Sequence, residues 1–313
     1  MPELDLSIII VSFNTLEYLK NCLDSIYAST GVERYEVIVV DNCSADGSPE
    51  MVESAFPPVK LIKPGANLGF ACANNLGARS AHGRYLLFLN PDTVVFPETF
   101  SKMVEFMDKK PMAGAANCRV LNEDGSVQLL ATRRKPTVPV LFLESLGINR
   151  RFPNNPINRK YTMAGWDRSD ARTVDVISGA FFMIRVNLFN TLCGFNERFF
   201  MYVEDLELCS RVWDSGYEIW FNSETKVIHF GGKASTNFPV IATIKGINAI
   251  YNFIKYFKVN IISYMYISCM ICAFLIRMYY HYIKLFFFED GINYYTLNND
   301  MLITKSLLHM DEL

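Results

Sequence analysis

The sequence lacks an excess of charge of either sign, since 30 Lys and Arg residues stand against 32 Asp and Glu residues. A chain without a strong basic field is not drawn to nucleic acid by its overall charge, so we expect no nucleic-acid partner. Internal repeats and low-complexity tracts are also absent from the sequence. The 50% hydrophobic content is high, and the excess is concentrated in the last quarter of the chain.

Cysteines with the spacing of metal ligands are missing from most of the chain, although it contains eight cysteines. The closely spaced pair, Cys269 and Cys272, lies inside an apolar run, where packing is a better explanation than metal binding. Residues 1–5 are polar, resemble no signal sequence and lead directly into a predicted strand. Scattered thiols without a signal sequence predict a reducing, cytoplasmic compartment.

Acidic residues are absent from residues 231–288, which carry six Lys and Arg residues among many aromatic and aliphatic ones. Residues 259–276 are uncharged over eighteen positions, which is near the lower limit for a membrane-spanning helix. Basic residues flank this run on both sides, so the positive-inside rule gives no orientation. The composition favours a tail that lies on an anionic membrane surface. A spanning helix, and a buried or dimer-forming helix pair in a homo-oligomer, are the alternatives.

Short apolar runs alternate with helical patterns over the first 90 residues. Four runs have the composition of strands buried on both faces; they are residues 6–12, 36–41, 59–62 and 85–89. Residues 18–26 and 70–81 have helical patterns between them. This alternation predicts a doubly wound α/β layer, in which ligands bind at the carboxyl ends of the strands. Asn14, Asp41 and Asp92 each lie just past such an end.

The pattern is less regular after residue 97. The predicted elements are a helix at residues 99–108 and strands at residues 114–121, 217–221 and 226–230. Residues 122–172 mix Pro, Asn and Arg with short apolar patches, which predicts long functional or mobile loops with a helix near residues 140–146. Residues 174–184 predict a strand that is broken at Gly179, where the backbone must approach something closely.

Two adjacent carboxylates, Glu204 and Asp205, follow an aromatic run and begin a helical pattern. Carboxylates at a helix N-terminus are stabilised by the backbone dipole, so a helix cap is one explanation of the pair. Glu207 and Arg211, four residues apart, predict an exposed ion pair on the same helix.

Residues 195–217, FNERFFMYVEDLELCSRVWDSGY, resemble the Glu-Asp motif region of family-2 inverting glycosyltransferases, especially the rhamnosyltransferase-like branch that builds bacterial surface polysaccharides. VVDNCSADGS, GANLGFACANNLG and NPD resemble further motifs of that family in the expected order, and the resemblance covers roughly residues 5–235. It implies a glycosyltransferase-A-like α/β fold, a mixed sheet with helices on both faces. We therefore expect a catalytic domain at residues 1–235 and a helical, membrane-associating tail at residues 236–313.

The resemblance implies contacts with a nucleotide-sugar donor in the first loops. Asp41 matches the position whose carboxylate hydrogen-bonds the nucleotide base, although an Asp after a strand could instead cap a turn. Ser12 and Asn14 match the first nucleotide-contacting loop. Asn67 and Gly69 belong to the rhamnosyltransferase-like signature, whose small residues allow the backbone to approach a ligand. A tight helix–sheet contact would explain the same small residues, and both explanations can hold.

A divalent cation, Mg or Mn, is implied near Asn90 and Asp92, where many relatives carry an Asp-x-Asp metal motif. A nucleotide diphosphate concentrates negative charge, which a hard cation held by carboxylates neutralises. Because the first position is Asn, the site would depend on Asp92. His229 matches a family position near the diphosphate, as a metal ligand or a donor to phosphate, although a His after a strand is often structural. Gly179 and Arg211 are placed with His229 in the acceptor or phosphate region.

The implied reaction moves a sugar, rhamnose or another hexose, from a nucleotide-diphosphate donor to a glycan or polyprenyl-linked glycan at the inner face of the cell membrane. Asp205 would accept the proton of the acceptor hydroxyl, and Glu204 would orient the acceptor or cap the helix. A nucleotidyltransferase would need a basic Gly-rich loop after the first strand, and SFNTLEY is not one. A catalytically silent nucleotide-sugar-binding subunit would not need the carboxylate pair.

Overall fold

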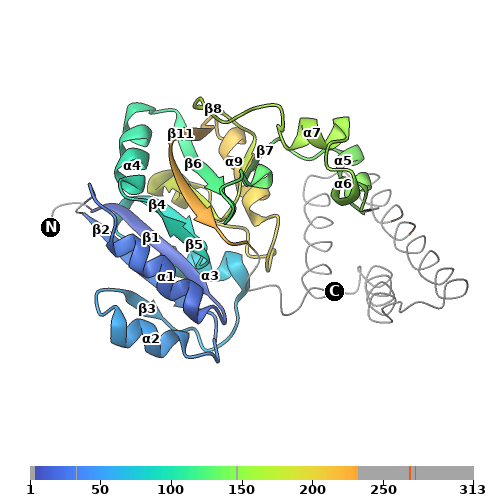
Figure 1. Ribbon diagram of the computed structural model, residues 1–313. Helices are drawn as coiled ribbons and strands as arrows, with labels where there is room; N and C mark the ends of the chain where they lie inside the picture. Colours follow the sequence, from blue (N-terminus) through green and yellow to red (C-terminus); the bar gives the residue numbers. More distant parts are fainter. Residues whose placement is uncertain (1–3, 33, 146, 232–267, 269–271, 273–313) are drawn as a thin grey trace, which may run out of the picture. The chain divides into compact units, whose positions relative to one another are not determined.

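The computed structural model describes residues 4–32, 34–145 and 147–231, together with residues 268 and 272 (Figure 1). The chain divides into two compact units, Met1–Lys135 with Thr162–Asn237, and Pro136–Tyr161 with Phe238–Leu313. The predicted boundary at residue 235, the tail behind it and the run at 259–276 lie outside the continuous described segments. In the described parts of the chain, no helix has both the length and the apolar composition to cross a membrane.

A nine-stranded mixed sheet lies at the centre of the first unit (Figure 1). Its order is β3-β2-β1-β4-β10-β6-β11-β5, and β8 pairs with β11. The strands are β1 (Leu4–Ser12), β2 (Tyr35–Asp41), β3 (Lys60–Ile62), β4 (Gly83–Leu89), β5 (Thr93–Val95), β6 (Ala113–Leu121), β8 (Arg172–Thr173), β10 (Phe181–Arg185) and β11 (Glu218–His229). Strands β1 to β4 are parallel, whereas β10 runs antiparallel to both β4 and β6. The predicted mixed α/β sheet is thereby confirmed.

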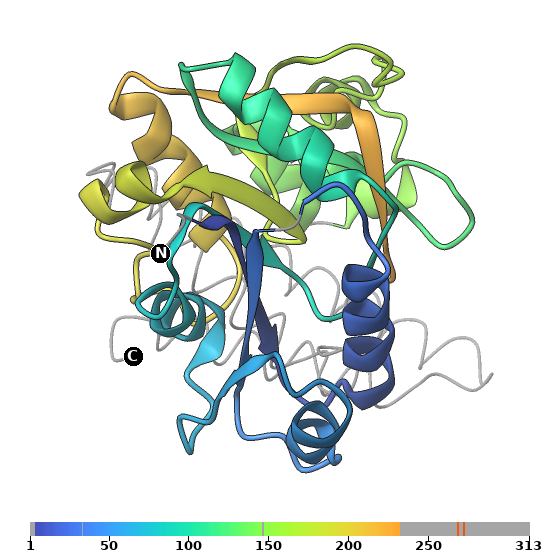
Figure 2. The same cartoon turned by 90° about the vertical axis from the view of Figure 1, so that its left-hand side faces the viewer.

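Helices cover both faces of this sheet, and α1 and α3 lie on opposite sides of β1 (Figure 2). The helices of this unit are α1 (Leu16–Tyr27), α2 (Ser48–Ala55), α3 (Gly69–Ala78), α4 (Thr99–Lys109), α8 (Val186–Thr191) and α9 (Glu204–Asp214). Ile8 and Ile10 share one core with Leu19 of α1. On the other face, a Cβ added at Gly77 of α3 would lie 2.6 Å from Ile9 Cγ2. Side chains of β1 are therefore buried on both faces, each isoleucine contributing about 1.5–3 kcal/mol.

An aromatic cluster fills the second face and supports the loop before α9. The ring centroids of Phe88 on β4 and Phe195 lie 4.8 Å apart in an edge-to-face arrangement. Phe182 and Phe189 contact the same Phe195 ring. The loop that leads to Glu204 is thus fixed at its start by packing against the sheet.

Several elements differ from the sequence expectations. The strands expected at residues 217–221 and 226–230 are one strand, β11, whose pairing with β6 is irregular between Asn222 and Lys226. Residues 122–172 contain the 3₁₀-helix η1 (Leu129–Ala131) and β7 (Thr132–Arg133), which pairs with β9 (Val176–Ile177). The second unit contributes α5 (Val138–Ser145), α6 (Ile148–Arg151) and α7 (Pro156–Tyr161), and the helix expected near residues 140–146 is confirmed as α5.

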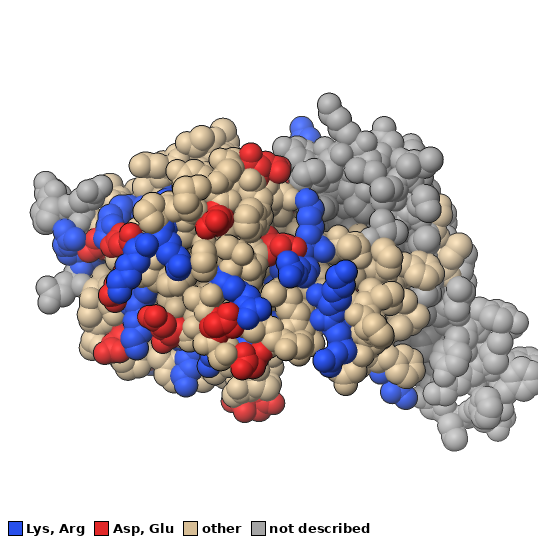
Figure 3. All heavy atoms as spheres, turned by 90° about the horizontal axis from the view of Figure 1, so that it is seen from above, with Lys and Arg blue, Asp and Glu red and all other residues tan. Residues whose placement is uncertain are grey.

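Charged side chains of both signs are interspersed over much of the face drawn in Figure 3. The arrangement agrees with the balanced composition of 30 basic and 32 acidic residues. Salt screens such mixed surface charges over about 8–10 Å, so they provide no long-range attraction for a polyanion.

Candidate active site

The strand ends bring predicted site residues from distant parts of the chain to one edge of the sheet. Ser12 and Asp41 are partners in the β1–β2 register, and β4 ends beside β1 immediately before Asn90. His229, the last residue of β11, pairs with Thr93 of β5. Residues near 12, 41, 90 and 229 thereby meet at the carboxyl edge, where α/β sheets bind ligands.

Asp41 is only 3% exposed, and its two carboxylate oxygens differ in their contacts. The backbone N–H of Ser44 donates to Asp41 Oδ2 over 2.9 Å. Asp41 Oδ1 is buried and has no hydrogen-bond partner among residues 4–32, 34–145 and 147–231. Leaving a buried acceptor unsatisfied costs about 1–3 kcal/mol. A ligand that brings an N–H or O–H donor to Oδ1 would recover that free energy.

Asn14 and Ser12 organise the loop that faces Asp41. The backbone N–H of Ala45 donates to Asn14 Oδ1 (2.8 Å), and the backbone N–H of Asn14 donates to Ser44 Oγ (2.9 Å). The hydroxyl of Ser12 lies 3.0 Å from that of Thr15. These bonds tie the loops after β1 and β2 into one surface. Direct contact of Ser12 and Asn14 with a nucleotide stays a prediction.

The loop at Gly69 approaches the loop before α9 more closely than a side chain would allow. A Cβ at Gly69, whose φ is +78°, would lie 2.4 Å from the carbonyl oxygen of Phe200. The backbone N–H of Phe70 donates to that same carbonyl (2.6 Å). Asn67 Oδ1 accepts from the Gly69 N–H (3.0 Å), and Asn42 Nδ2 donates to the Gly69 carbonyl (3.0 Å). The close approach is therefore to protein backbone, and donor contact by Asn67 stays a prediction.

Asn90, Asp92 and His229 form a compact polar cluster. His229 Nε2 lies 3.2 Å from Asp92 Oδ1 and 3.1 Å from Asn90 Nδ2. Gln128 contacts the other side of His229, with Oε1 2.9 Å from Nδ1 and Nε2 donating to the His229 carbonyl (2.5 Å). Gln128 was not among the residues predicted from the sequence.

Asp92 and His229 offer an oxygen and a nitrogen donor to a cation. In the described portion of the chain, no group of three or more His, Cys, Asp or Glu residues is arranged to hold a metal ion. However, the 3.2 Å between His229 Nε2 and Asp92 Oδ1 suits two adjacent ligands of one cation. Ligands at right angles, each about 2.1 Å from an octahedral cation, lie about 3.0 Å apart. Mg²⁺ in phosphate sites takes few protein ligands and completes its shell with phosphate oxygens and water.

Helix α9 begins after two residues with strained backbones. Tyr202 and Val203 have φ values of +70° and +71°, and a positive φ is a genuine outlier for a β-branched residue. Such strain costs of order 1–3 kcal/mol per residue and persists at functional sites when the surroundings enforce it. Glu204 and Asp205 follow these two residues in the first turn of α9, where they are 6% and 9% exposed.

The two carboxyl groups at the start of α9 have different surroundings. Burial, and then the charge of Asp205, raise the pKa of Glu204 from 4.5 to about 8. Glu204 Oε2 is buried without a hydrogen-bond partner in the part of the protein that the structure describes. Asp205 Oδ2 instead lies 3.6 Å from Arg133 Nη2, and its Oδ1 accepts from the Leu206 N–H (2.7 Å). The arrangement favours a protonated Glu204 at neutral pH, beside an Asp205 carboxyl group that faces Arg133.

The predicted exposed ion pair of Glu207 and Arg211 is wrong in its exposure. Glu207 is fully buried, and Arg211 Nη2 lies 2.6 Å from its Oε2. Arg211 also donates to the carbonyls of Leu192 and Gly194. The pair is buried because the turn at Leu192–Gly194 lies on this face of the helix, which spacing alone does not indicate. The placement of Arg211 in the acceptor or phosphate region stays a prediction.

The strand expected at residues 174–184 is interrupted at Gly179, which lies between β9 and β10, as predicted. A Cβ at Gly179 would lie 2.8 Å from Cζ of Phe70, so the close approach is to an aromatic ring. A role for Gly179 in binding the acceptor or phosphate stays a prediction.

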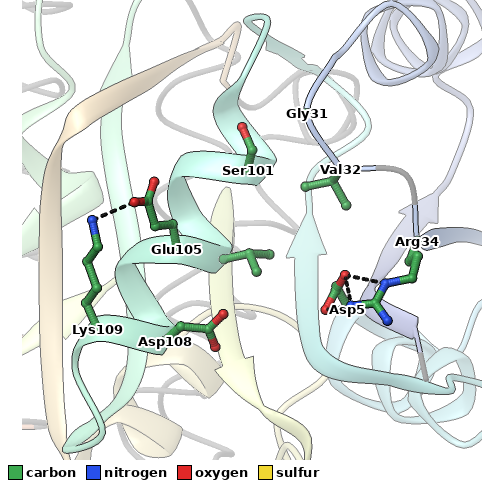
Figure 4. Close-up of a pocket in the computed structure, with 9 residues that line it drawn as sticks. Asp5, Gly31, Val32, Arg34, Ser101, Glu105, Asp108 and Lys109 are labelled. Carbon is green, nitrogen blue, oxygen red and sulfur yellow. Dashed lines mark hydrogen bonds and ion pairs between the residues drawn. The ribbon is translucent and has the colours of Figure 1, made fainter. Parts of the chain in front are cut away.

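A separate surface hollow of about 680 Å³ lies near the opposite ends of β1 and β2 (Figure 4). It is lined by Asp5, Gly31, Val32, Arg34, Ser101, Val104, Glu105, Asp108 and Lys109. Its charged groups are paired: Arg34 lies 2.9 Å from Asp5, Lys109 lies 2.5 Å from Glu105, and Asp108 lies 2.5 Å from Arg84 outside the lining. With these charges already paired, the hollow offers none of the unsatisfied groups found at the carboxyl edge.

Three residues of the site were missed by the sequence analysis. Asn42 directly follows Asp41 in a motif that was recognised, so its position was an available signal. Arg133 lies in the basic stretch TRRK within predicted loops, where binding residues are often found. Gln128 carries no such signal, because its partner His229 is 101 residues away.

Comparison with known sequences places these features in a family. Residues 7–193 match the family described as "Glycosyl transferase family 2". N-acetylglucosaminyl-diphospho-decaprenol L-rhamnosyltransferase of Mycobacterium tuberculosis is 28% identical over 236 residues, covering 72% of this chain and 75% of that protein. Rhamnosyltransferase WbbL of Escherichia coli is 27% identical over 240 residues, covering 74% of this chain and 85% of that protein.

Solved structures share the fold at low sequence identity. The mannosyltransferase PcManGT from Pyrobaculum calidifontis, solved with GDP-Man and Mn²⁺, has a TM-score of 0.57 and 16% identity, covering 98% of this chain and 84% of that one. TarS 1–349 of S. aureus has a TM-score of 0.54 and 14% identity, covering 98% of this chain and 71% of that one. The expected glycosyltransferase-A-like fold is confirmed. Since the family match spans more than half of the sequence, this chain belongs to glycosyl transferase family 2 and is a glycosyltransferase of the rhamnosyltransferase-like kind.

Proposed function

We propose that this chain transfers a hexose, with rhamnose the first candidate, from a nucleotide-diphosphate donor to a glycan or polyprenyl-linked glycan, with inversion and with a divalent cation. The observation that carries the proposal is the buried pair Glu204 and Asp205 at the start of α9, where Asp205 faces Arg133 and Glu204 Oε2 has no hydrogen-bond partner in the described chain. The two rhamnosyltransferase relatives support rhamnose, and the decaprenol in one relative's name supports a lipid-linked acceptor.

Donor binding would use the carboxyl edge of β1, β2 and β4. A nucleotide base that donates an N–H to Asp41 Oδ1 would satisfy the buried oxygen that lacks a partner in the described chain. Asp92 and His229 would hold a divalent cation, Mg or Mn, which when bound neutralises charge on the diphosphate. PcManGT, whose fold is similar, was solved with Mn²⁺.

Asp205 would act as the general base. Its carboxylate would take the proton of an acceptor hydroxyl while that oxygen attacks the anomeric carbon and the bond to the diphosphate breaks. A single displacement of this kind inverts the configuration at that carbon. Arg133 keeps Asp205 paired in the absence of substrate. Glu204, protonated at neutral pH, would not compete for the proton and could donate a hydrogen bond to the acceptor.

A panel of nucleotide-sugars tests the donor assignment. A bound donor should raise the melting temperature of the full chain by mass action, and the stabilising sugar should be transferred to a polyprenyl-linked glycan. Asp92→Asn should keep the fold and lose turnover, whereas Glu123→Gln, an exposed carboxylate in a turn, should change neither. If Asp92→Asn turned over like wild type with and without chelator, the cation assignment would be wrong.

Membrane association is the remaining part of the proposal. A polyprenyl-linked acceptor lies in a bilayer, and the basic, aromatic composition of residues 236–313 suits an anionic lipid surface at the cytoplasmic face. Removing residues 234–313 should release the chain from anionic vesicles. A truncated chain that sedimented with those vesicles as well as the full chain would refute this part.

A further inference from the structure

The side-chain amide of Gln128 contacts His229 twice, and the two contacts fix its orientation. The carbonyl oxygen of His229 can only accept, so the group 2.5 Å from it must be the amide nitrogen of Gln128. The amide oxygen, Oε1, then faces His229 Nδ1 at 2.9 Å. The assignment follows from the hydrogen-bond network and does not depend on seeing hydrogens.

This orientation selects one tautomer of His229. Gln128 Oε1 can only accept, so Nδ1 must carry the proton, which leaves Nε2 of the neutral ring with a lone pair. That lone pair lies 3.2 Å from Asp92 Oδ1 and can accept from Asn90 Nδ2 at 3.1 Å. We propose that Gln128 is a positioning residue that holds His229 in the Nδ1–H tautomer, with Nε2 ready to bind the diphosphate-associated cation. This inference rests on the proposed function for the identity of the ligand.

The backbone around Gln128 makes the contact rigid. The N–H of Gln128 donates to the carbonyl of Val120 on β6 (2.9 Å), and the N–H of Ala131 donates to the carbonyl of Gln128 (3.0 Å). Strand β6 pairs with β11 up to Leu121 and Ile228, the residue before His229. The sheet register therefore carries Gln128 to the side of His229.

Without Gln128 the population of the opposite tautomer of His229, with the proton on Nε2, would increase. An Nε2–H tautomer could donate to Asp92 Oδ1, because only 3.2 Å separates the two atoms. That bond would occupy both proposed ligands at once, and the proton would have to leave before a cation could bind. Orienters of this type commonly alter metal affinity 10- to 100-fold.

The test uses the full chain and reads the tautomer directly. In the ¹⁵N spectrum of ligand-free wild type, recorded at a pH where the His229 ring is neutral, the signals lost in His229→Gln should show a protonated Nδ1 and an unprotonated Nε2. Gln128→Met, close in size but unable to accept at this position, should shift His229 toward the Nε2–H form. Gln128→Glu keeps an acceptor for Nδ1–H but loses the donor to the His229 carbonyl, so it should retain the wild-type tautomer without that second contact. Asn122→Ala removes a bond to Ser126 in the neighbouring turn and should leave the tautomer unchanged.

Cation binding gives a second readout. Mn²⁺ affinity, measured by electron paramagnetic resonance with uridine, guanosine or thymidine diphosphate, should fall about 10- to 100-fold in Gln128→Met and recover largely in Gln128→Glu. Gln128→Met with the wild-type tautomer and unchanged Mn²⁺ affinity would overturn the inference. If wild type bound no Mn²⁺ with any of these diphosphates, the cation of the proposed function would fall, and the spectra would still decide whether Gln128 sets the tautomer. If Gln128→Met did not fold, Gln128→Ser would take its place.

Discussion

The first two turns of α9 carry buried carboxylates with opposite surroundings. Glu207 is fully buried and makes close contacts with Arg211 through both of its oxygens. Glu204, three residues earlier, is nearly as buried, yet its Oε2 has no hydrogen-bond partner within the described segments. A buried carboxylate that the fold uses for support is saturated by its own chain, whereas one left incomplete is a candidate for ligand contact or proton transfer.

The largest effect is expected when the ion pair of Glu207 and Arg211 is broken. Arg211→Met should lower the free energy of unfolding by about 3–5 kcal/mol, because it leaves the Glu207 carboxylate buried without its partner. Urea denaturation at pH 7 measures the loss. The double variant Glu207→Gln with Arg211→Met has no buried charge there and should regain much of the stability. A loss below about 1 kcal/mol in the single variant would mean that the pair is not structural.

The second prediction concerns Glu204, whose Oε2 has no hydrogen-bond partner in the described chain. The pKa of Glu204 is raised from 4.5 to about 8 by burial and by Asp205, while Arg133 lowers it. Folded protein therefore retains a proton that the unfolded chain releases between about pH 4.5 and 8, so stability falls as pH rises through this window. Glu204→Gln has no proton to release and should remove that fall, an effect on the order of 3 kcal/mol at pH 8. Denaturation curves at pH 5 and pH 8 check it, and equal pH dependence in both proteins would refute the assigned pKa.

The smallest effect concerns the strained turn before the pair. Val203 has a φ of +71°, which glycine adopts without strain, so Val203→Gly should raise the free energy of unfolding by about 1 kcal/mol. It should also slow transfer, because the start of α9 is then held less firmly. Val212, which lies within α9 and has an ordinary φ, is the control, and Val212→Gly should destabilise. If both variants destabilised equally, the backbone at Val203 would not be strained.

The sequence predicted most of the fold because the strands are short β-branched runs with both faces buried. The register of β1 with β2 then follows, and with it the meeting of Ser12 and Asp41 at one edge. The single strand β11 was not predicted, since the polar residues between Asn222 and Lys226 interrupt its apolar pattern. A local apolar pattern predicts the two ends of such a strand as separate strands and does not show that they are continuous.

Residues of the candidate site could be proposed from the sequence where a motif or a strand end marks them, as at Asp92, His229 and Asp205, and their roles stay predictions. Arg133 and Gln128 act on these residues from loops that have no periodic pattern. The burial of Glu207 likewise depends on the turn at Leu192–Gly194, to which Arg211 donates. Contacts of this kind arise from tertiary packing, and a single sequence carries no local trace of them.

The most direct test of the account is the single-turnover rate of sugar transfer in Asp205→Asn and Glu204→Gln, measured with donor affinity. Asp205→Asn keeps the shape of the side chain and removes its basicity, so donor binding should persist while the chemical step slows about 100-fold or more. Glu204→Gln should have the milder effect, since Glu204 is already protonated at neutral pH. A near-normal rate in Asp205→Asn beside an inactive Glu204→Gln would contradict the account and assign the base to Glu204.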